Sequence, residues 1–146
     1  MSIVTAAYGD DTWHAMVALR RRVLRAPLGL DYDPAQLDAE RDQLHLAVIH
    51  DGMVAGTLLI VPPDPLGTGR LRQMAVAPEL RRRGFGAALV RHAEALLGGM
   101  GAVCIGLSAR ESAVAFYEAL GFAPCGAPYV EVTLPHVRMG KRLSTP

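Results

Sequence analysis

Apolar residues recur along the chain with two periods, which predict both strands and helices. Continuous or alternating apolar runs bounded by turn residues are typical of β-strands. The pair Asp51-Gly52 separates two such runs and predicts a tight hairpin. The prolines and glycines of residues 62–69 predict a turn, and Pro78 should end the strand that follows. We expect strands at residues 2–6, 45–50, 53–61, 70–77 and 102–107, with one or two more between residues 129 and 143.

Three segments show the 3.6-residue period of amphipathic helices. The first should start from an N-cap at Asp10, Asp11 or Thr12 and run to about Leu24. A loop over residues 25–34 and a short helical turn over 35–41 should follow it. A second helix should begin near Gly84 or Phe85 and end at Gly98, Gly99 and Gly101, and Gly121 should end a third. The expected buried faces are Trp13, Met16, Val17, Leu19 and Val23, with Arg20, Arg21 and Arg22 on the polar side; Leu89, Ala93, Leu96, Leu97 and Met100; and Ala113, Phe116, Tyr117 and Leu120.

The order of these elements predicts an α/β (α+β) fold. The apolar run at residues 102–107 follows a helix and has the composition of a strand covered on both faces, so it should lie parallel to the strand before that helix. We expect a mixed, mostly antiparallel sheet with one parallel pair and helices on both faces. A length of 146 residues suits one domain, residues 1–146.

Composition and charge narrow the functional classes. The chain is 51% apolar and 20% charged, as in globular proteins, and its net charge of +1 gives no global reason to bind nucleic acid or a membrane. Cys104 and Cys125 lack metal-site or disulfide-framework spacing. The N-terminus has no signal-peptide pattern and no apolar run is long enough for a membrane span, so we expect a cytoplasmic protein.

The segment from Gln73 to Val90 holds the clearest candidate chemistry. Arg81, Arg82, Arg83, Gly84 and Gly86 lie between a predicted strand and a predicted helix. Unpaired N–H groups at a helix N-terminus, the helix dipole and glycines without Cβ suit a bound diphosphate. Neither the Walker loop nor the dinucleotide fingerprint fits this pattern. An isolated RxxGxG also occurs by chance in a solvated turn, so the motif needs support from elsewhere in the chain.

That support comes from a resemblance to the GNAT acetyltransferases. Arg81 to Gly86 matches the [QR]xxGx[GA] signature of that family, and Met74 to Glu79 resembles its fourth strand and exit. Ala109 to Phe122 is similar to its second cofactor segment, including the FYxxxGF ending, so the likeness covers roughly residues 71–122. The stretches Arg20–Leu24, Pro27–Gly29 and Leu134–Met139 resemble a subgroup of small bacterial members related to the ElaA type.

The resemblance implies acetyl-CoA as co-substrate, with no metal. Main-chain groups of the fourth strand would pair with the pantetheine arm, and amides from Arg82 through Ala87 would hold the pyrophosphate. Many members have Asn where Arg110 stands, which leaves the contact made by that Asn in doubt here. The implied cofactor-binding residues are Met74, Ala75, Val76, Arg81, Arg82, Arg83, Gly84, Phe85, Gly86, Ala87, Arg110, Ser112 and Phe116.

Candidate catalytic residues follow from the same resemblance and from side-chain chemistry. Tyr117 matches the tyrosine near the cofactor sulfur and would be the general acid, although its spacing also suits a core aromatic. The amine must lose a proton, for which Glu131 and His136 are the candidate bases; a lone histidine is also common as a structural residue. Glu79 and Glu118 are expected to be solvated.

The acceptor end is less defined by the sequence. Arg20, Arg21, Arg22 and Arg25, with Asp31 and Asp33, fall where this fold shapes the acceptor pocket, and they also suit a solvated helix face. The predicted function is direct transfer of acetyl to a primary amine, on a small molecule or peptide, in a ternary complex. The resemblance also allows a homodimer. The alternatives are a non-catalytic acyl-CoA-binding regulatory module and, with weaker support, arginine-mediated binding of nucleic acid.

Overall fold

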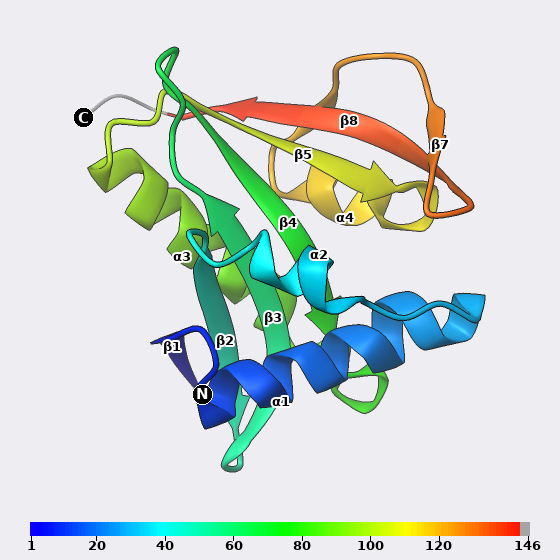
Figure 1. The fold of residues 1–146 in the computed structure, drawn as a ribbon. Coiled ribbons are helices and arrows are strands. Elements are labelled where there is room, and N and C mark those ends of the chain that lie inside the picture. Colours follow the sequence, from blue (N-terminus) through cyan, green and yellow to red (C-terminus); the bar gives the residue numbers. More distant parts are fainter. Residues whose placement is uncertain (144–146) are drawn as a thin grey trace.

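One mixed sheet organises the residues described by the computed structural model, 1–143; the last three residues of the predicted domain, 144–146, lie outside them. Eight strands in this range run in the order β1-β2-β3-β4-β5-β8-β6, and β7 pairs with β8 (Figure 1). Strands β4 and β5 are parallel and every other pair is antiparallel, as the sequence predicts. The strands are β1 (Ser2–Ala6), β2 (Leu44–His50), β3 (Met53–Val61), β4 (Thr68–Val76), β5 (Cys104–Arg110), β6 (Ala123–Pro124), β7 (Tyr129–Glu131) and β8 (Leu134–Arg142).

The helices also follow the predicted order, with one difference at the end of the first. Asp10 caps α1, and its carboxylate accepts a hydrogen bond from Trp13 N at 2.7 Å. The predicted helix to Leu24 is wrong in detail, because the chain changes to a π-helical turn after Arg20 and then to a 3-10 turn. The helical segments are α1 (Asp11–Arg20), η1 (Arg21–Arg25), η2 (Ala26–Leu28), α2 (Pro34–Asp38), η3 (Pro78–Leu80), α3 (Phe85–Gly99), η4 (Glu111–Ala113) and α4 (Val114–Ala119).

Two hydrophobic cores lie on opposite faces of the sheet. Side chains of a strand alternate between faces, so Leu58 and Ile60 of β3 join the core under α3, while Leu59 joins the core under α1. All three are fully buried, and each such burial contributes about 1.5–3 kcal/mol. Figure 1 shows α1 and α2 on one face and α3 and α4 on the other, which confirms helices on both faces.

Four expectations about burial are wrong. Phe116, expected on the buried face of its helix, is 37% exposed because it lies at the surface beside Gly86. Met100 is 44% exposed, because α3 ends at Gly99 and Met100 lies beyond the buried stripe. Arg20, expected on a polar face, is fully buried because it pairs with Glu40. The apolar run at 102–107 is not covered on both faces. Its strand starts at Cys104, and burial alternates along it because α1 and α2 lie over β2 to β4 and leave β5 open on that side (Figure 1).

Candidate active site

A cleft forms where β4 and β5 part. Their pairing joins Thr68–Leu71 to Cys104–Leu107 and stops there, and the space beyond has a volume of about 1090 Å³. A bulge in β4 marks the point of separation, since Thr57 pairs with Ala75 but Leu59 pairs with Arg72. Gln73 adopts the left-handed backbone conformation of this bulge, with φ 58°. Its carbonyl accepts a hydrogen bond from Thr57 Oγ1 at 3.0 Å. The unpaired edge of β4 beyond the bulge lines the cleft.

The N-terminus of α3 opens into the same cleft. Gly84 caps it with φ 82°, a left-handed conformation that glycine adopts without strain. The first main-chain hydrogen bond runs from Ala88 N–H to Gly84 O at 3.0 Å, so the N–H groups of Phe85, Gly86 and Ala87 have no intrahelical partner. A Cβ on Gly86 would lie 3.1 Å from the Phe116 ring, so a larger residue here would have to displace that ring. The arrangement can bind a diphosphate through main-chain groups.

Most of the predicted site residues line this one cleft. Met74, Ala75, Val76, Arg81, Arg82, Gly84, Phe85, Gly86, Ala87, Arg110, Ser112, Phe116, Tyr117, Glu131 and His136 do so, whereas Arg83 does not. Segments that lie far apart in the sequence are therefore brought together as the motifs indicate.

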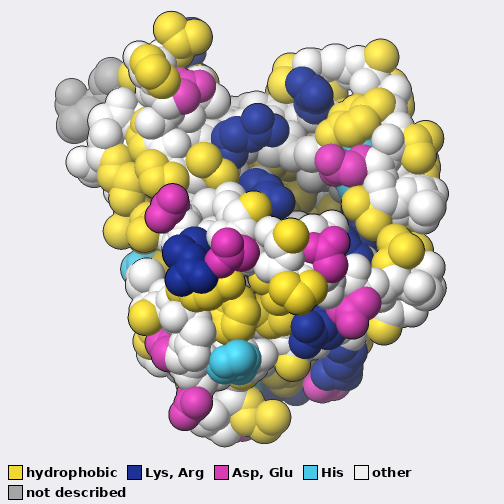
Figure 2. All heavy atoms as spheres, in the orientation of Figure 1, with side chains coloured by type: hydrophobic (Ala, Val, Ile, Leu, Met, Phe, Trp, Pro, Cys, Tyr) yellow, Lys and Arg dark blue, Asp and Glu magenta, His cyan; other side chains and the backbone are white. Residues whose placement is uncertain are grey.

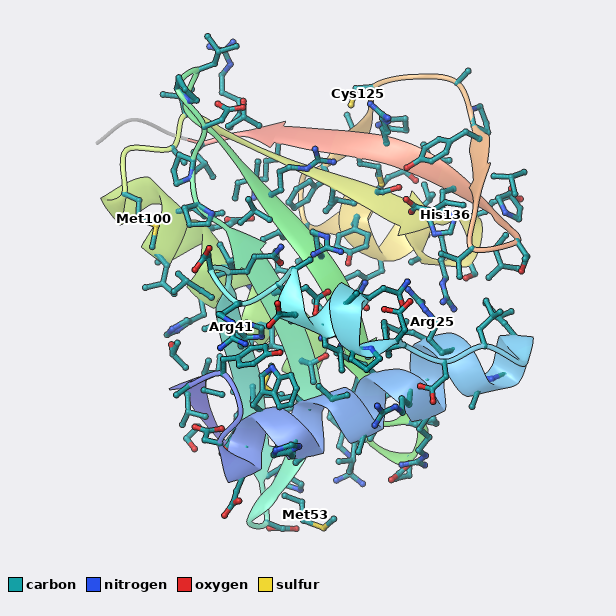
Figure 3. The ribbon with its side chains drawn as sticks, in the orientation of Figure 1. Arg25, Arg41, Met53, Met100, Cys125 and His136 are labelled. Atoms are coloured by element: carbon teal, nitrogen blue, oxygen red, sulfur yellow. The ribbon has the colours of Figure 1, made fainter. Side chains whose placement is uncertain are left out.

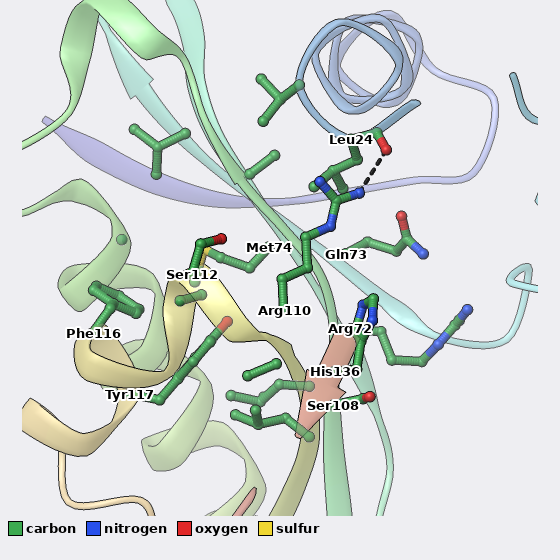
Figure 4. Close-up of a pocket in the computed structure, with 18 of the residues that line it drawn as sticks. Leu24, Arg72, Gln73, Met74, Ser108, Arg110, Ser112, Phe116, Tyr117 and His136 are labelled. Atoms are coloured by element: carbon green, nitrogen blue, oxygen red, sulfur yellow. Dashed lines mark hydrogen bonds between the residues drawn. The ribbon is translucent and has the colours of Figure 1, made fainter. Parts of the chain in front are cut away.

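Tyr117 presents its hydroxyl to the cleft from an otherwise buried ring (Figure 4). The residue is 6% exposed, and its ring packs edge-on against Phe116 and Phe122 with centroids 4.9 Å and 5.8 Å away. Burial raises the pKa of Tyr117 well above its ordinary value, because the phenolate would be poorly solvated. The phenol is therefore protonated at neutral pH and can donate to an anion that forms beside it.

The two candidate bases, His136 and Glu131, are adjacent. His136 is 5% exposed, and its Nδ1 lies 2.9 Å from Leu134 O. A carbonyl can only accept, so in the neutral ring this contact assigns the proton to Nδ1 and leaves the Nε2 lone pair free. Glu131 Oε2 lies 3.7 Å from Nε2, where it can stabilise the imidazolium. Ser108 also lines this wall, and its hydroxyl group is in contact with the hydroxyl group of Tyr129.

The arginines of the first helical segment separate into different environments. Arg21 and Arg22 form exposed ion pairs with Asp31 at 2.7 Å and Glu79 at 2.6 Å. Asp33 caps α2 and accepts from Gln36 N at 2.8 Å. Glu79 is exposed to solvent, as predicted, and its carboxylate also forms the ion pair with Arg22. Of the residues expected at the acceptor end, Arg25 lines the cleft. Figure 3 shows Arg25 and His136 at the same gap, between the end of α1 and the β7–β8 hairpin.

Arg110, where many members of the family have Asn, turns its side chain across the cleft. Its Nη2 donates to Leu24 O at 2.6 Å (Figure 4), and Arg25 Nη1 donates to the same oxygen at 3.2 Å. Burial and then the charge of Arg25 lower the pKa of Arg110. The sequence reasoning missed Arg72, Gln73 and Ser108, which also line the cleft. Polar residues at alternate positions, Arg70 and Arg72 in β4 and Ser108 and Arg110 in β5, are the signal that would have found Arg72 and Ser108. Gln73 follows Arg72 directly and has no such signal, because the bulge places it in the cleft.

Comparisons with known proteins identify the class. The model of the acetyltransferase (GNAT) family matches residues 13–122, so the chain belongs to that family of acyl-CoA-dependent acetyltransferases. An uncharacterized N-acetyltransferase of Bacillus subtilis, YitI, is 29% identical over 142 residues, 93% of each chain. The structure of Escherichia coli ElaA has a TM-score of 0.81 at 19% identity, covering 96% of this chain and 98% of that one.

A third relative carries a bound ligand. An aminoglycoside 6'-N-acetyltransferase solved in complex with coenzyme A has a TM-score of 0.81 at 15% identity, covering 99% of this chain and 98% of that one. At these identities the structural likenesses show the fold, which agrees with the predicted one. Membership of the ElaA-type subgroup stays a prediction.

No helix within residues 1–143 has both the length and the apolar character needed to cross a membrane. Within the same range no three His, Cys, Asp or Glu side chains gather as a metal site would require.

Proposed function

We propose that this protein transfers the acetyl group of acetyl-CoA directly to a primary amine, with both substrates bound in the cleft between β4 and β5. The observation that carries the proposal is the placement of Tyr117 and His136 on two walls of one cleft, beside an unpaired strand edge and an open helix N-terminus. A protonated phenol and a free imidazole nitrogen are the acid and base that this reaction needs.

The donor half of the cleft suits a CoA thioester. The main chain of Met74, Ala75 and Val76 would pair with the pantetheine amides as an added strand. The free N–H groups at the start of α3 would hold the pyrophosphate, with Arg81 and Arg82 adding charge. Ser112 and Phe116 line the cleft close by. Arg83 has less support, because it does not line the cleft, and the guanidinium of Arg110 is turned away toward Leu24.

The chemical step then follows from the two side chains. His136 Nε2 takes one proton from the ammonium group, and Glu131 stabilises the imidazolium. The amine nitrogen bonds to the thioester carbon, and an amide of β4 would donate to the oxyanion. The C–S bond breaks, and the Tyr117 hydroxyl gives its proton to the departing thiolate. The proton that remains on the acetylated nitrogen then passes to the Tyr117 oxygen, which restores the phenol. No covalent enzyme intermediate is required, since both substrates are held in position for direct attack.

Two variants test the proposed roles. Tyr117→Phe and His136→Gln should each lower kcat roughly 100- to 10,000-fold, the contribution typical of general acid–base catalysis. Release of CoA thiol over an amine panel measures turnover, and calorimetry measures acetyl-CoA affinity, which should change little in both. His14→Gln, at an exposed histidine on α1, is the matched control.

The rival function, a regulatory module that binds acyl-CoA without catalysis, gives a different result. That protein would bind acetyl-CoA tightly and release no thiol with any amine, in the wild type as in the variants. Unchanged turnover in Tyr117→Phe would instead show that Tyr117 is not the general acid, and it would leave the proposed acetyl transfer standing. The cytoplasmic location and the homodimer stay predictions from the sequence.

A further inference from the structure

The acceptor end of the cleft is built from one face of three strands. In β4, Arg70 and Arg72 flank the buried Leu71, so both project to the opposite face, toward α1 and α2. In β5, Ser108 and Arg110 share that face, and their register partners in β8, Arg138 and His136, share it too. Figure 2 shows Lys and Arg side chains gathered in the hollow of the molecule on this side.

These arginines are short of carboxylate partners. Within residues 1–143 no ion pair involves Arg25, Arg70, Arg110 or Arg138. Arg72 reaches Glu40 at 3.4 Å, but that carboxylate is already 3.0 Å from the buried Arg20. The positive charge on this side of the cleft is therefore incompletely neutralised by the protein.

The arrangement of Arg25 and Arg110 is the most specific sign of an anion-binding site. Both guanidinium groups donate to the carbonyl oxygen of Leu24, so two like charges lie side by side in a half-buried site. Like charges at such a distance repel, and an anion between or above them removes the repulsion while forming charge-assisted hydrogen bonds. A guanidinium also offers the forked donors that match a carboxylate.

The strands next to Arg110 bring the contrary charge to the same space, because its register partner His136 lies beside Glu131. Glu131 lines the cleft beside His136, where the amine has to lose its proton. An acceptor with an ammonium group at one end and an anionic group at the other would match both ends.

We infer that the amine acceptor carries a carboxylate, which Arg25 and Arg110 hold with Arg72 beside them. The amino group of the acceptor then faces His136. The substrate class is an amino acid or a similar small carboxylate-bearing amine. The inference rests on the proposed acetyl transfer for its chemistry. It excludes polyamines and other polycationic acceptors, because four or more guanidinium groups would repel them.

Matched acceptors test this inference directly. Each amino acid of a panel is compared with its primary amide and its decarboxylated amine, with CoA thiol release as the readout. The preferred amino acid should have a kcat/KM roughly 10- to 100-fold above its amide, the range of one charge-assisted hydrogen bond. Arg25→Gln and Arg110→Gln should each bring that ratio close to one, and Arg110→Lys should keep part of it. Arg91→Gln, an exposed arginine on α3, is the control and should keep the full ratio.

A binding measurement separates this inference from the transfer reaction. Calorimetry compares N-acetyl amino acids with their methyl esters on the CoA-bound protein, at low and high salt. Amides or decarboxylated amines that react as well as the amino acids would overturn the inference and leave acetyl transfer standing. Carboxylate-dependent binding with no turnover on any amine would keep the anion site and overturn the transfer function. Equal weak binding of acids and esters, with no turnover, would overturn both.

Discussion

The buried pair of Arg20 and Glu40 gives the sharpest prediction about stability. Arg20 is 0% exposed and Glu40 is 4% exposed, and Arg20 Nη2 lies 3.0 Å from both carboxylate oxygens. Replacement of Arg20 by Met leaves Glu40 buried, and among residues 1–143 the remaining ion-pair partner of its carboxylate is Arg72, at 3.4 Å. The variant Arg20→Met should lose about 3–5 kcal/mol of the free energy of unfolding, the cost of one partner lost from a buried pair.

That loss is large on the scale of the whole chain. Domains of this size unfold with about 5–15 kcal/mol, so the variant gives up roughly a fifth or more of the total stability. The melting temperature should fall by roughly 6–20 °C, taking about 2–4 °C per kcal/mol. Urea unfolding followed by circular dichroism at pH 7 measures the effect.

A double variant shows whether the charge or the packing is responsible. Arg20→Met combined with Glu40→Leu removes both charges and should return to within about 1–2 kcal/mol of the wild type, because apolar side chains of similar volume replace a buried pair well. Arg21→Met, which breaks an exposed pair, is the control and should leave the unfolding midpoint nearly unchanged. A stable Arg20→Met protein, or a double variant weaker than either single one, would refute the reasoning.

Three further predictions address the cleft, its hairpin and the response to pH. Gly86→Val should weaken acetyl-CoA binding at least tenfold in calorimetry, because the new side chain meets Phe116 within about 3.1 Å, whereas Gly98→Ala, with nothing within 4 Å, should not; equal affinities would contradict this. Thr133→Gly should raise the melting temperature by about 2–4 °C, since a β-branched residue at φ 63° costs roughly 1 kcal/mol; no gain would contradict a strained turn. Burial lowers the pKa of His45, whose Nδ1 has no partner, so the unfolded chain binds the proton more readily: stability should be complete above about pH 6.5 and fall below it. Melting curves from pH 8 to 5 measure that slope, which should be shallower in His45→Gln, and identical slopes would count against His45 as the source.

The segments expected at the donor end lie together in one cleft, and the sequence could indicate them because each is contiguous. Main-chain groups before Pro78 and after Gly84 need only a strand, a turn and a helix start, and each has a local signal. The segment from Ala109 to Phe122 carries Tyr117 four positions before Gly121, the residue expected to end its helix. Local patterns of this kind are preserved in the folded chain, so the positions of these segments follow from them. That they bind the cofactor stays a prediction.

The acceptor end could not be predicted in the same way, because long-range contacts decide it. Arg20 lies on the apolar face of α1 with Met16 and Val17, but the pattern within α1 does not identify its partner. That partner is Glu40, twenty positions later. Arg110 meets Leu24 across 86 positions. The β-bulge at Gln73 contains no glycine, so the sequence has no local residue that would predict it. In each case the partner lies on another element, and no periodicity within one segment contains that information.

The short pairing of β4 with β5 also has a kinetic consequence. The two strands are joined over four residue pairs and then separate, so the opening passes between strands and reaches both faces of the sheet. The thioester would enter from the side of α3 and the amine from the side of α1, and neither would obstruct the other. Initial rates should therefore give intersecting lines when both concentrations vary, and CoA and the acetylated amine should be free to leave in either order.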